Sequence, residues 1–143
     1  MATTAFTNSH RRDLFNGVID LSSDTIRMAL YSGSSHGVNT TAYTVTNEAS
    51  GTGYTAGGEI MAGASQTTDT SNNASFYDWN DVSWASSTIT ATDCLVYDDT
   101  VTTPTANVAL SVHDFGGSRS SSAGTFTVTL PTAAHNTALI RLA

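Results

Sequence analysis

Apolar and hydroxyl side chains alternate without a break in the segment TFTVTL, residues 125–130. Phe126, Val128 and Leu130 fall on one side of an extended chain, and three threonines fall on the other. A period of two is the pattern of a β-strand with one buried face, and β-branched residues suit such a pleated surface. The same alternation begins at Thr25 and recurs to the C-terminus, so this pattern predicts a chain built mainly from strands.

Turn residues separate the alternating segments, as expected for successive short strands. The segments expected as strands are 25–31, 43–46, 59–65, 74–79, 82–84, 87–97, 108–112, 125–130 and 138–142. In the longest of them Asp93 would face inward, and a bulge near Thr92 would relieve that conflict. No helix separates the later segments, so we expect an antiparallel β-sandwich or barrel of about eight strands, not a doubly wound α/β fold.

The N-terminal region has a different pattern. Residues 1–8 are small and polar and predict a flexible arm. A short helix is expected at Ser9–Asp20, capped by Asn8 or Ser9. Its apolar stripe would consist of Leu14, Phe15, Val18, Ile19 and Leu21. Residues 9–143 would then form a single β-sandwich domain with an N-terminal helix.

The charge of the chain limits its partners. The 143 residues carry a formal net charge of −7, with five arginines and no lysine. An acidic surface repels phosphate backbones, so we expect no binding to nucleic acid. Arg11 and Arg12 are adjacent cations, which we interpret as the solvated face of the helix.

The sequence also predicts a protein that is made without export and without disulfides. Its first ten residues lack the charged start and apolar stretch of a signal peptide. No apolar run approaches the roughly 20 residues of a membrane span, so we expect no membrane association. Cys94 is the single cysteine and lies in the apolar run CLVY, where we interpret it as a small core residue.

A glycine-rich stretch, NEASGTGYTAGGEIMAG at residues 47–63, raises the question of a phosphate site. From Gly51 the spacing is Gly-x-Gly-x-x-x-Gly, which departs from the dinucleotide pattern, and residues 59–70 do not predict a helix. A Walker loop needs a lysine, and the chain has none. We therefore expect a glycine-rich bend with residues at positive φ, whose Tyr54 packs back on the sheet.

Other residue types with catalytic chemistry do not form a convincing site. The four histidines, His10, His36, His113 and His135, lack zinc-ligand spacing. His113 and Asp114 are neighbours in a strand and would face opposite ways. We therefore expect no catalytic, cofactor-binding or metal site, and no enzyme.

Trp79 and Trp84 flank a short polar segment, NDVS. Two tryptophans near a turn could form a platform for stacking on carbohydrate. The other interpretation, which we favour, places one of them in the core and the other in an interface, where aromatic residues are enriched.

The segments LSSDTIRMALYS, NEASGTGYTAGGE, FYDWNDVSWASSTITA, CLVYDDT and DFGG…SSAGTFTVTLP together resemble a group of small virion proteins of tailed bacteriophages. The similarity runs in order from about Leu14 to Leu130. It implies a non-enzymatic virion structural protein and assigns no catalytic residues.

From this resemblance we expect a capsid decoration or cement protein. It would be made in the host cytoplasm and would bind the major capsid protein at the capsid surface, as a homo-oligomer, with a trimer favoured. The alternatives are a tail or head–tail junction protein and a carbohydrate-binding receptor module. The expected contact segments are the arm at residues 1–8 and the loops at residues 33–42 and 116–123. The candidate interface residues are Phe6, Arg11, Arg12, Tyr54, Trp79, Trp84 and Arg119.

Overall fold

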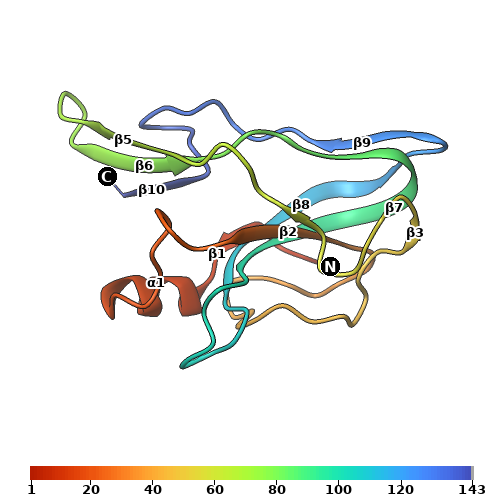
Figure 1. The fold of residues 1–143 in the computed structure, drawn as a ribbon, viewed down its shortest axis with the longest axis horizontal. Coiled ribbons are helices and arrows are strands. Elements are labelled where there is room, and N and C mark those ends of the chain that lie inside the picture. The colour runs from red at the N-terminus through yellow and green to blue at the C-terminus, as the bar shows by residue number, and fades with distance from the viewer. Residues whose placement is uncertain (143) are drawn as a thin grey trace.

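Antiparallel strands make up most of the chain in the computed structural model, which describes residues 1–142 (Figure 1). The elements in chain order are β1 (Ala5–Phe6), α1 (Asn8–Phe15), β2 (Ile26–Tyr31), β3 (Gly51–Thr52), β4 (Glu59–Ile60), β5 (Ser65–Asp69), β6 (Ala74–Asp78), β7 (Val82–Asp98), β8 (Ala109–Ser120), β9 (Gly124–Val128) and β10 (Ile140–Leu142). The prediction of a mainly β, antiparallel fold with one short N-terminal helix is confirmed.

The 17-residue strand β7 organises the fold, because it belongs to both layers. β8 pairs with its second half and β9 with its first half, so the chain from β8 to β9 follows β7 along its length. Figure 1 shows β7 running along the upper layer, turning at one end of the molecule and returning in the lower layer. Strands that change sheet at such a corner need bulges or bends. The turn coincides with a register shift between Trp84 and Ser87, and with Ser86 at φ 48°.

The two layers are completed by the remaining strands. In the lower layer the order is β1-β8-β7-β2-β4, and β3 adds to β7. In the upper layer β10, β6 and β5 form a separate three-stranded sheet. Within residues 1–142 β9 is paired only on its β7 side, so the sheets stay open and form a sandwich, not a closed barrel.

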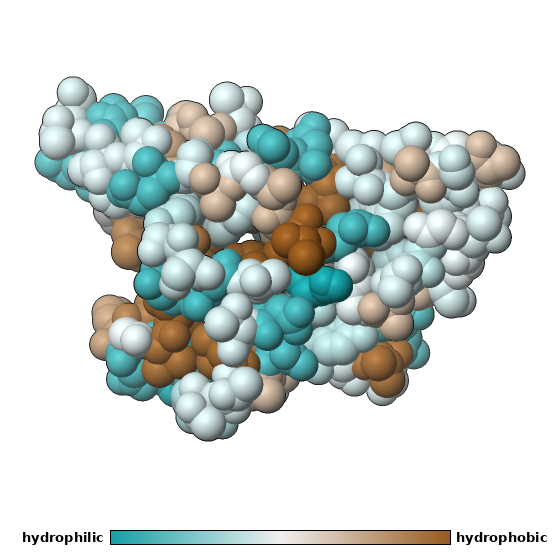
Figure 2. Space-filling model, in the orientation of Figure 1, coloured by the Kyte–Doolittle hydropathy of each residue, from teal (hydrophilic) through white to brown (hydrophobic). Residues whose placement is uncertain are grey.

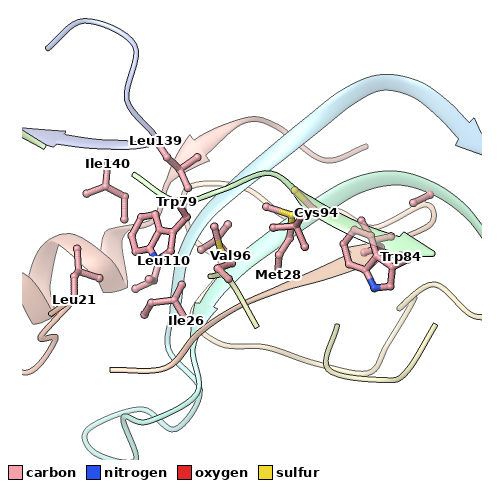
Figure 3. Packing of buried hydrophobic residues seen from close by; sticks show 14 of the residues in the cluster. Leu21, Ile26, Met28, Trp79, Trp84, Cys94, Val96, Leu110, Leu139 and Ile140 are labelled. Atoms are coloured by element: carbon pink, nitrogen blue, oxygen red, sulfur yellow. The ribbon is translucent and has the colours of Figure 1, made fainter. Parts of the chain in front are cut away.

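The surface is mainly polar, and the apolar side chains are gathered between the layers. Figure 2 shows a face that is mostly hydrophilic or near neutral, with apolar colour in separate patches. The main core runs along the molecule, from Leu21 and Ile140 near the helix to Trp84 near the corner (Figure 3). A second, smaller cluster on the opposite face of the lower sheet includes Tyr31 and Leu95. Strand β2 and the second half of β7 are therefore buried on both faces.

A bulge in β7 explains how this strand serves both clusters. The register with β8 shifts between Ala91 and Asp93, as the sequence predicted near Thr92. Ala91 belongs to the main core, and so does Cys94, whereas Leu95 faces the second cluster. The extra residue thus reverses which alternate positions face the main core.

The N-terminal segment is part of the fold, which corrects the prediction of a flexible arm at residues 1–8. β1 pairs with β8 and Ala2 is buried. The hydroxyl of Thr7 is buried and donates to the carbonyl of Ala109 at 2.6 Å. Small polar residues predicted flexibility, but here their hydroxyls hydrogen-bond to the sheet.

The helix is shorter than predicted and buries a different face. It is capped by Thr7, not by Asn8 or Ser9 as predicted; the Thr7 side chain accepts from the backbone N–H of His10, and the helix ends at Phe15. Its buried residues are the polar Ser9, His10 and Asp13, whereas Phe15 is 92% exposed. The predicted apolar stripe is therefore wrong at Phe15.

Two strand predictions also need correction. Residues 43–46 lie outside the strands, and only isolated bridges form on either side of them, Ala42 with Val108 and Glu48 with Tyr31. The predicted strand 59–65 is replaced by the two-residue β4 and by β5, which begins at Ser65. Residues 116–120, expected in a loop, belong to β8.

Candidate interaction surface

The glycine-rich segment is closed by its own hydrogen bonds. The carboxylate of Glu48 accepts from the hydroxyls of Tyr43 at 2.6 Å and Tyr54 at 2.8 Å, and from the N–H of Gly57 at 2.7 Å. The Tyr54 hydroxyl also accepts from the backbone N–H of Leu30 in β2, at 2.9 Å. Burial, and then the bonded Glu48 carboxylate, raise the pKa of Tyr54 above its ordinary value. The prediction that Tyr54 packs back on the sheet is confirmed.

Glycine is required where this segment meets neighbouring strands. Gly51 has φ +145° and Gly58 has φ +69°. A Cβ on Gly51 would overlap the carbonyl oxygen of Thr88, and one on Gly58 would overlap that of Met28. Both obstacles are backbone atoms, which cannot rotate away. These glycines let the chain lie directly against β7 and β2, and the segment leads into β4, not into a helix.

A buried cluster of polar side chains surrounds Asp93, and the sequence did not predict its partners. Ser34 donates to this carboxylate at 2.6 Å and Thr92 at 2.8 Å, while Nδ1 of His36 lies 3.5 Å from it. Burial would raise the pKa of Asp93, but the contacts with His36, Ser34 and Thr92 outweigh it and lower the pKa. A polar residue in an apolar strand was the one signal that partners were needed.

This cluster does not have the arrangement of a nucleophilic site. The hydroxyl of Ser34 is directed to the Asp93 carboxylate, whereas an activated serine hydroxyl would be bonded to a base such as imidazole. Ser34 is only 2% exposed, and the ring of His36 stacks edge-on against Tyr31 at 4.3 Å. The arrangement keeps the buried charge of Asp93 hydrogen-bonded.

Trp79 and Trp84 are both core residues, which corrects the prediction that one of them lies in an interface. Their exposed fractions are 6% and 1%. The ring of Trp84 packs against Tyr54 and Phe126, each at 6.0 Å between centroids. The stacking platform required for a carbohydrate-binding module is therefore not formed by these side chains.

Three of the other candidate residues lie together around β1 and α1. Phe6 is partly buried and its ring stacks on that of His10 at 4.8 Å. Arg12 is bound to the buried carboxylate of Asp13 by two hydrogen bonds, of 2.6 and 2.8 Å. Arg11 is exposed and donates to Asn8. Both arginines are exposed to solvent, and Arg12 also pairs with the buried charge of Asp13.

Arg119 lies apart from that group, beside β9. It lines a groove of about 580 Å³ together with Phe115, Ser120 and the β9 residues from Thr125 onward. The Phe115 and Phe126 rings lie 6.4 Å apart. Arg119 is exposed and is the one basic side chain among the residues lining this groove. The structure thus places a cation and apolar rings beside an open strand edge.

A second groove, of about 720 Å³, lies between the N-terminal segment and the loop at residues 35–44. Met1 and Thr3 line one side of it. The N–H of Thr3 donates to the carbonyl of His36, so a backbone hydrogen bond holds the two segments together at this point. Two of the expected contact segments, residues 1–8 and 33–42, are therefore neighbours on the surface.

Within the residues that the structure describes, no group of three or more histidine, cysteine, aspartate or glutamate side chains is placed to hold a metal ion. None of the helices in residues 1–142 has the length and apolar character needed to cross a membrane. Comparison of the chain with protein-family models, with curated proteins and with solved structures found no match.

Proposed function

We propose that this protein is a non-enzymatic structural component of a bacteriophage particle, namely a decoration protein on the outer surface of the major capsid protein shell. The resemblance of its sequence segments to small virion proteins suggests that the protein belongs to a bacteriophage particle. The observation that carries the proposal is the closed glycine-rich segment. Its most ligand-like residues, Glu48 and Tyr54, are bonded to each other and to the backbone of the protein itself.

The fold suits a stabilising role on a shell. Strand β2 and the second half of β7 have packed side chains on both faces, so the middle of the domain is a continuous core. A domain that bridges neighbouring capsid subunits adds buried area across the joint between them. Repeated attachment sites on a shell allow many weak contacts to act together. The net charge of −7 disfavours contact with packaged DNA.

Copy number in purified particles tests this proposal. A decoration protein should be present in numbers comparable to the major capsid protein, and the purified protein should bind empty heads that lack tails. A few copies per particle that remain with isolated tails would instead support the tail or head–tail junction alternative. Absence from purified particles would contradict a structural role in the virion altogether.

A further inference from the structure

The outer edge of β9 is an open strand edge without any feature that blocks pairing. Among residues 1–142, β7 is the one strand paired with β9. Between Arg119 and His135 the sequence has no ionisable side chain, and the one proline in that stretch, Pro131, follows β9. An extended, uncharged and unpaired edge is a template for another strand.

The other edges of the sheets carry features that oppose such pairing. β1, β3 and β4 have two residues each, and β10 has three. β5 is as long as β9 but is polar throughout and ends at Asp69. The outer edge of β8 is interrupted by Gly116 and Gly117 at positive φ, and Arg119 donates across it to the carbonyl of Phe115 at 3.2 Å. Short strands, charges and local twists are the usual protection of edges. β9 itself carries no charged side chain and no residue at positive φ, and the one charged side chain that lines the groove beside it is Arg119.

We propose that β9 pairs with the β9 of a second copy of this chain, antiparallel across a two-fold axis at Thr127. In this register Phe126 of one copy lies opposite Val128 of the other, and Thr125 opposite Thr129. One face of the joined sheet then carries apolar side chains from both copies, and the other face carries threonines from both copies. Cross-strand pairs of either kind stabilise neighbouring strands. The contact is isologous, so it closes after two copies.

Charge supports a second copy as the occupant of this edge. Two copies of a chain with a net charge of −7 repel each other, and they approach at lower cost along an edge such as Gly124–Val128, whose own residues carry no acidic side chain. The surface over β9, in the right-hand upper part of Figure 2, is pale and lacks strongly hydrophilic colour. The N-terminal segment cannot supply the added strand, because β1 is paired with β8 of its own sheet.

This inference goes beyond the proposed function and does not depend on it, because the contact needs no capsid. It also differs from the trimer expected from the resemblance, since a two-fold contact of one edge with itself cannot close a ring of three. One strand pair makes a small interface, so we expect a dissociation constant in the micromolar range.

Sedimentation of the purified protein over a range of concentrations tests the association. We expect a reversible increase from the mass of one chain to the mass of two. A protein that stays monomeric up to submillimolar concentration, or that assembles to three chains, would overturn the proposal.

A charge exchange at the two-fold axis tests where the copies meet. Thr127 is exposed, so Thr127→Glu should leave the monomer folded, as circular dichroism would verify. It places like charges opposite each other and should weaken association about tenfold or more. Thr127→Arg alone should do the same, and mixing the two variants should restore the dimer.

The matched control is Thr67→Glu, which introduces the same charge at an exposed threonine in the middle of β5. We expect its association to equal that of the unchanged protein. Persistence of the dimer in Thr127→Glu, or equal weakening by Thr67→Glu, would show that β9 is not the contact.

Discussion

Replacing Gly58 by alanine tests whether the glycines of residues 47–63 shape the backbone or serve a ligand. A Cβ at Gly58 would overlap the carbonyl oxygen of Met28 and would lie 2.6 Å from its carbonyl carbon and 2.7 Å from the Cα of Ala29. These atoms belong to β2, which is buried in the central sheet. The strain cannot be relieved by a side-chain rotation, so the segment would have to move away from β2.

Gly116 provides a matched control for this substitution. Its φ of +68° is nearly the same as the +69° of Gly58, but no atom lies within 4 Å of an added Cβ. Alanine at either position would have to adopt the left-handed backbone conformation, which costs about 1–2 kcal/mol. It also restricts the unfolded chain equally at both. The difference between the two variants therefore isolates the overlap with β2.

We expect Gly58→Ala to lower the free energy of unfolding by about 2–4 kcal/mol more than Gly116→Ala does, because overpacking typically costs about 1–3 kcal/mol and the pairing of β4 with β2 would also be disturbed. Urea titrations followed by tryptophan fluorescence would measure this, since Trp79 and Trp84 are buried. Equal losses in the two variants would refute the steric role of Gly58. A stable Gly58→Ala protein that had lost a bound small molecule would instead support a ligand site.

Three further predictions concern buried polar groups. Tyr54→Phe should cost about 2–3 kcal/mol in unfolding titrations, because it leaves the buried N–H of Leu30 unpaired; a loss under about 0.5 kcal/mol would contradict this role. Burial, together with the neighbouring Asp24 carboxyl, raises the pKa of Asp98 to about 6. The folded state therefore holds this proton more tightly than the unfolded state, and the contribution of Asp98 to stability should fall as the pH rises from about 4 to 6. Buried His10, whose pKa is lowered to about 4, contributes the opposite slope, so the Asp98 slope is measured as the difference from an Asp98→Asn variant. Asp98→Asn should remove that slope and add about 1–2 kcal/mol at pH 7, whereas an unchanged slope in unfolding titrations at several pH values would contradict it. Burial also raises the pKa of the Cys94 thiol, so a thiol reagent should label it only as fast as the protein unfolds; rapid labelling of the native protein would show it to be accessible.

The sequence predicted the strands whose alternation reflects a single buried face. The segment 125–130 is the clearest case, and β9, Gly124–Val128, overlaps most of it. The bulge near Thr92 was also predictable, because a buried Asp93 conflicted with the apolar residues around it. In both cases the information is local, since neighbouring side chains in one strand reveal which side is buried.

The features that the sequence did not predict depend on distant contacts. Segments 82–84 and 87–97 were expected as separate strands but form the single β7. The strand bends at Ser86, which adopts a positive φ, and the sequence pattern does not predict that conformation. The helix was predicted too long because its buried face is polar. His10, for example, is buried against the carbonyl of Leu110, a hundred residues away, and that burial lowers its pKa to about 4.

Candidate interface residues were the least predictable part. Aromatic and cationic side chains suit interfaces and cores equally, and only the fold decides between them. One of Trp79 and Trp84 was therefore predicted at an interface, although both fill the core. The open edge of β9 could not be predicted for a related reason. The pattern of a strand does not show how many neighbouring strands it will pair with.

Hydroxyl side chains explain how a chain with few charges builds a corner between its two layers. Ser87 is fully buried at the turn of β7, and its hydroxyl lies 2.7 Å from that of Ser121 on the segment joining β8 and β9. Ser121 also accepts from the N–H of Ile89, so backbone groups that lose strand partners at the bend gain side-chain partners instead. Both strands of the ribbon are bent at this point, with Ser86 at φ 48° and Ala123 at φ 49°. The serine contacts hold the two bends together and so set the direction of β9. The exposed edge proposed for pairing is therefore a consequence of the same corner that encloses the core.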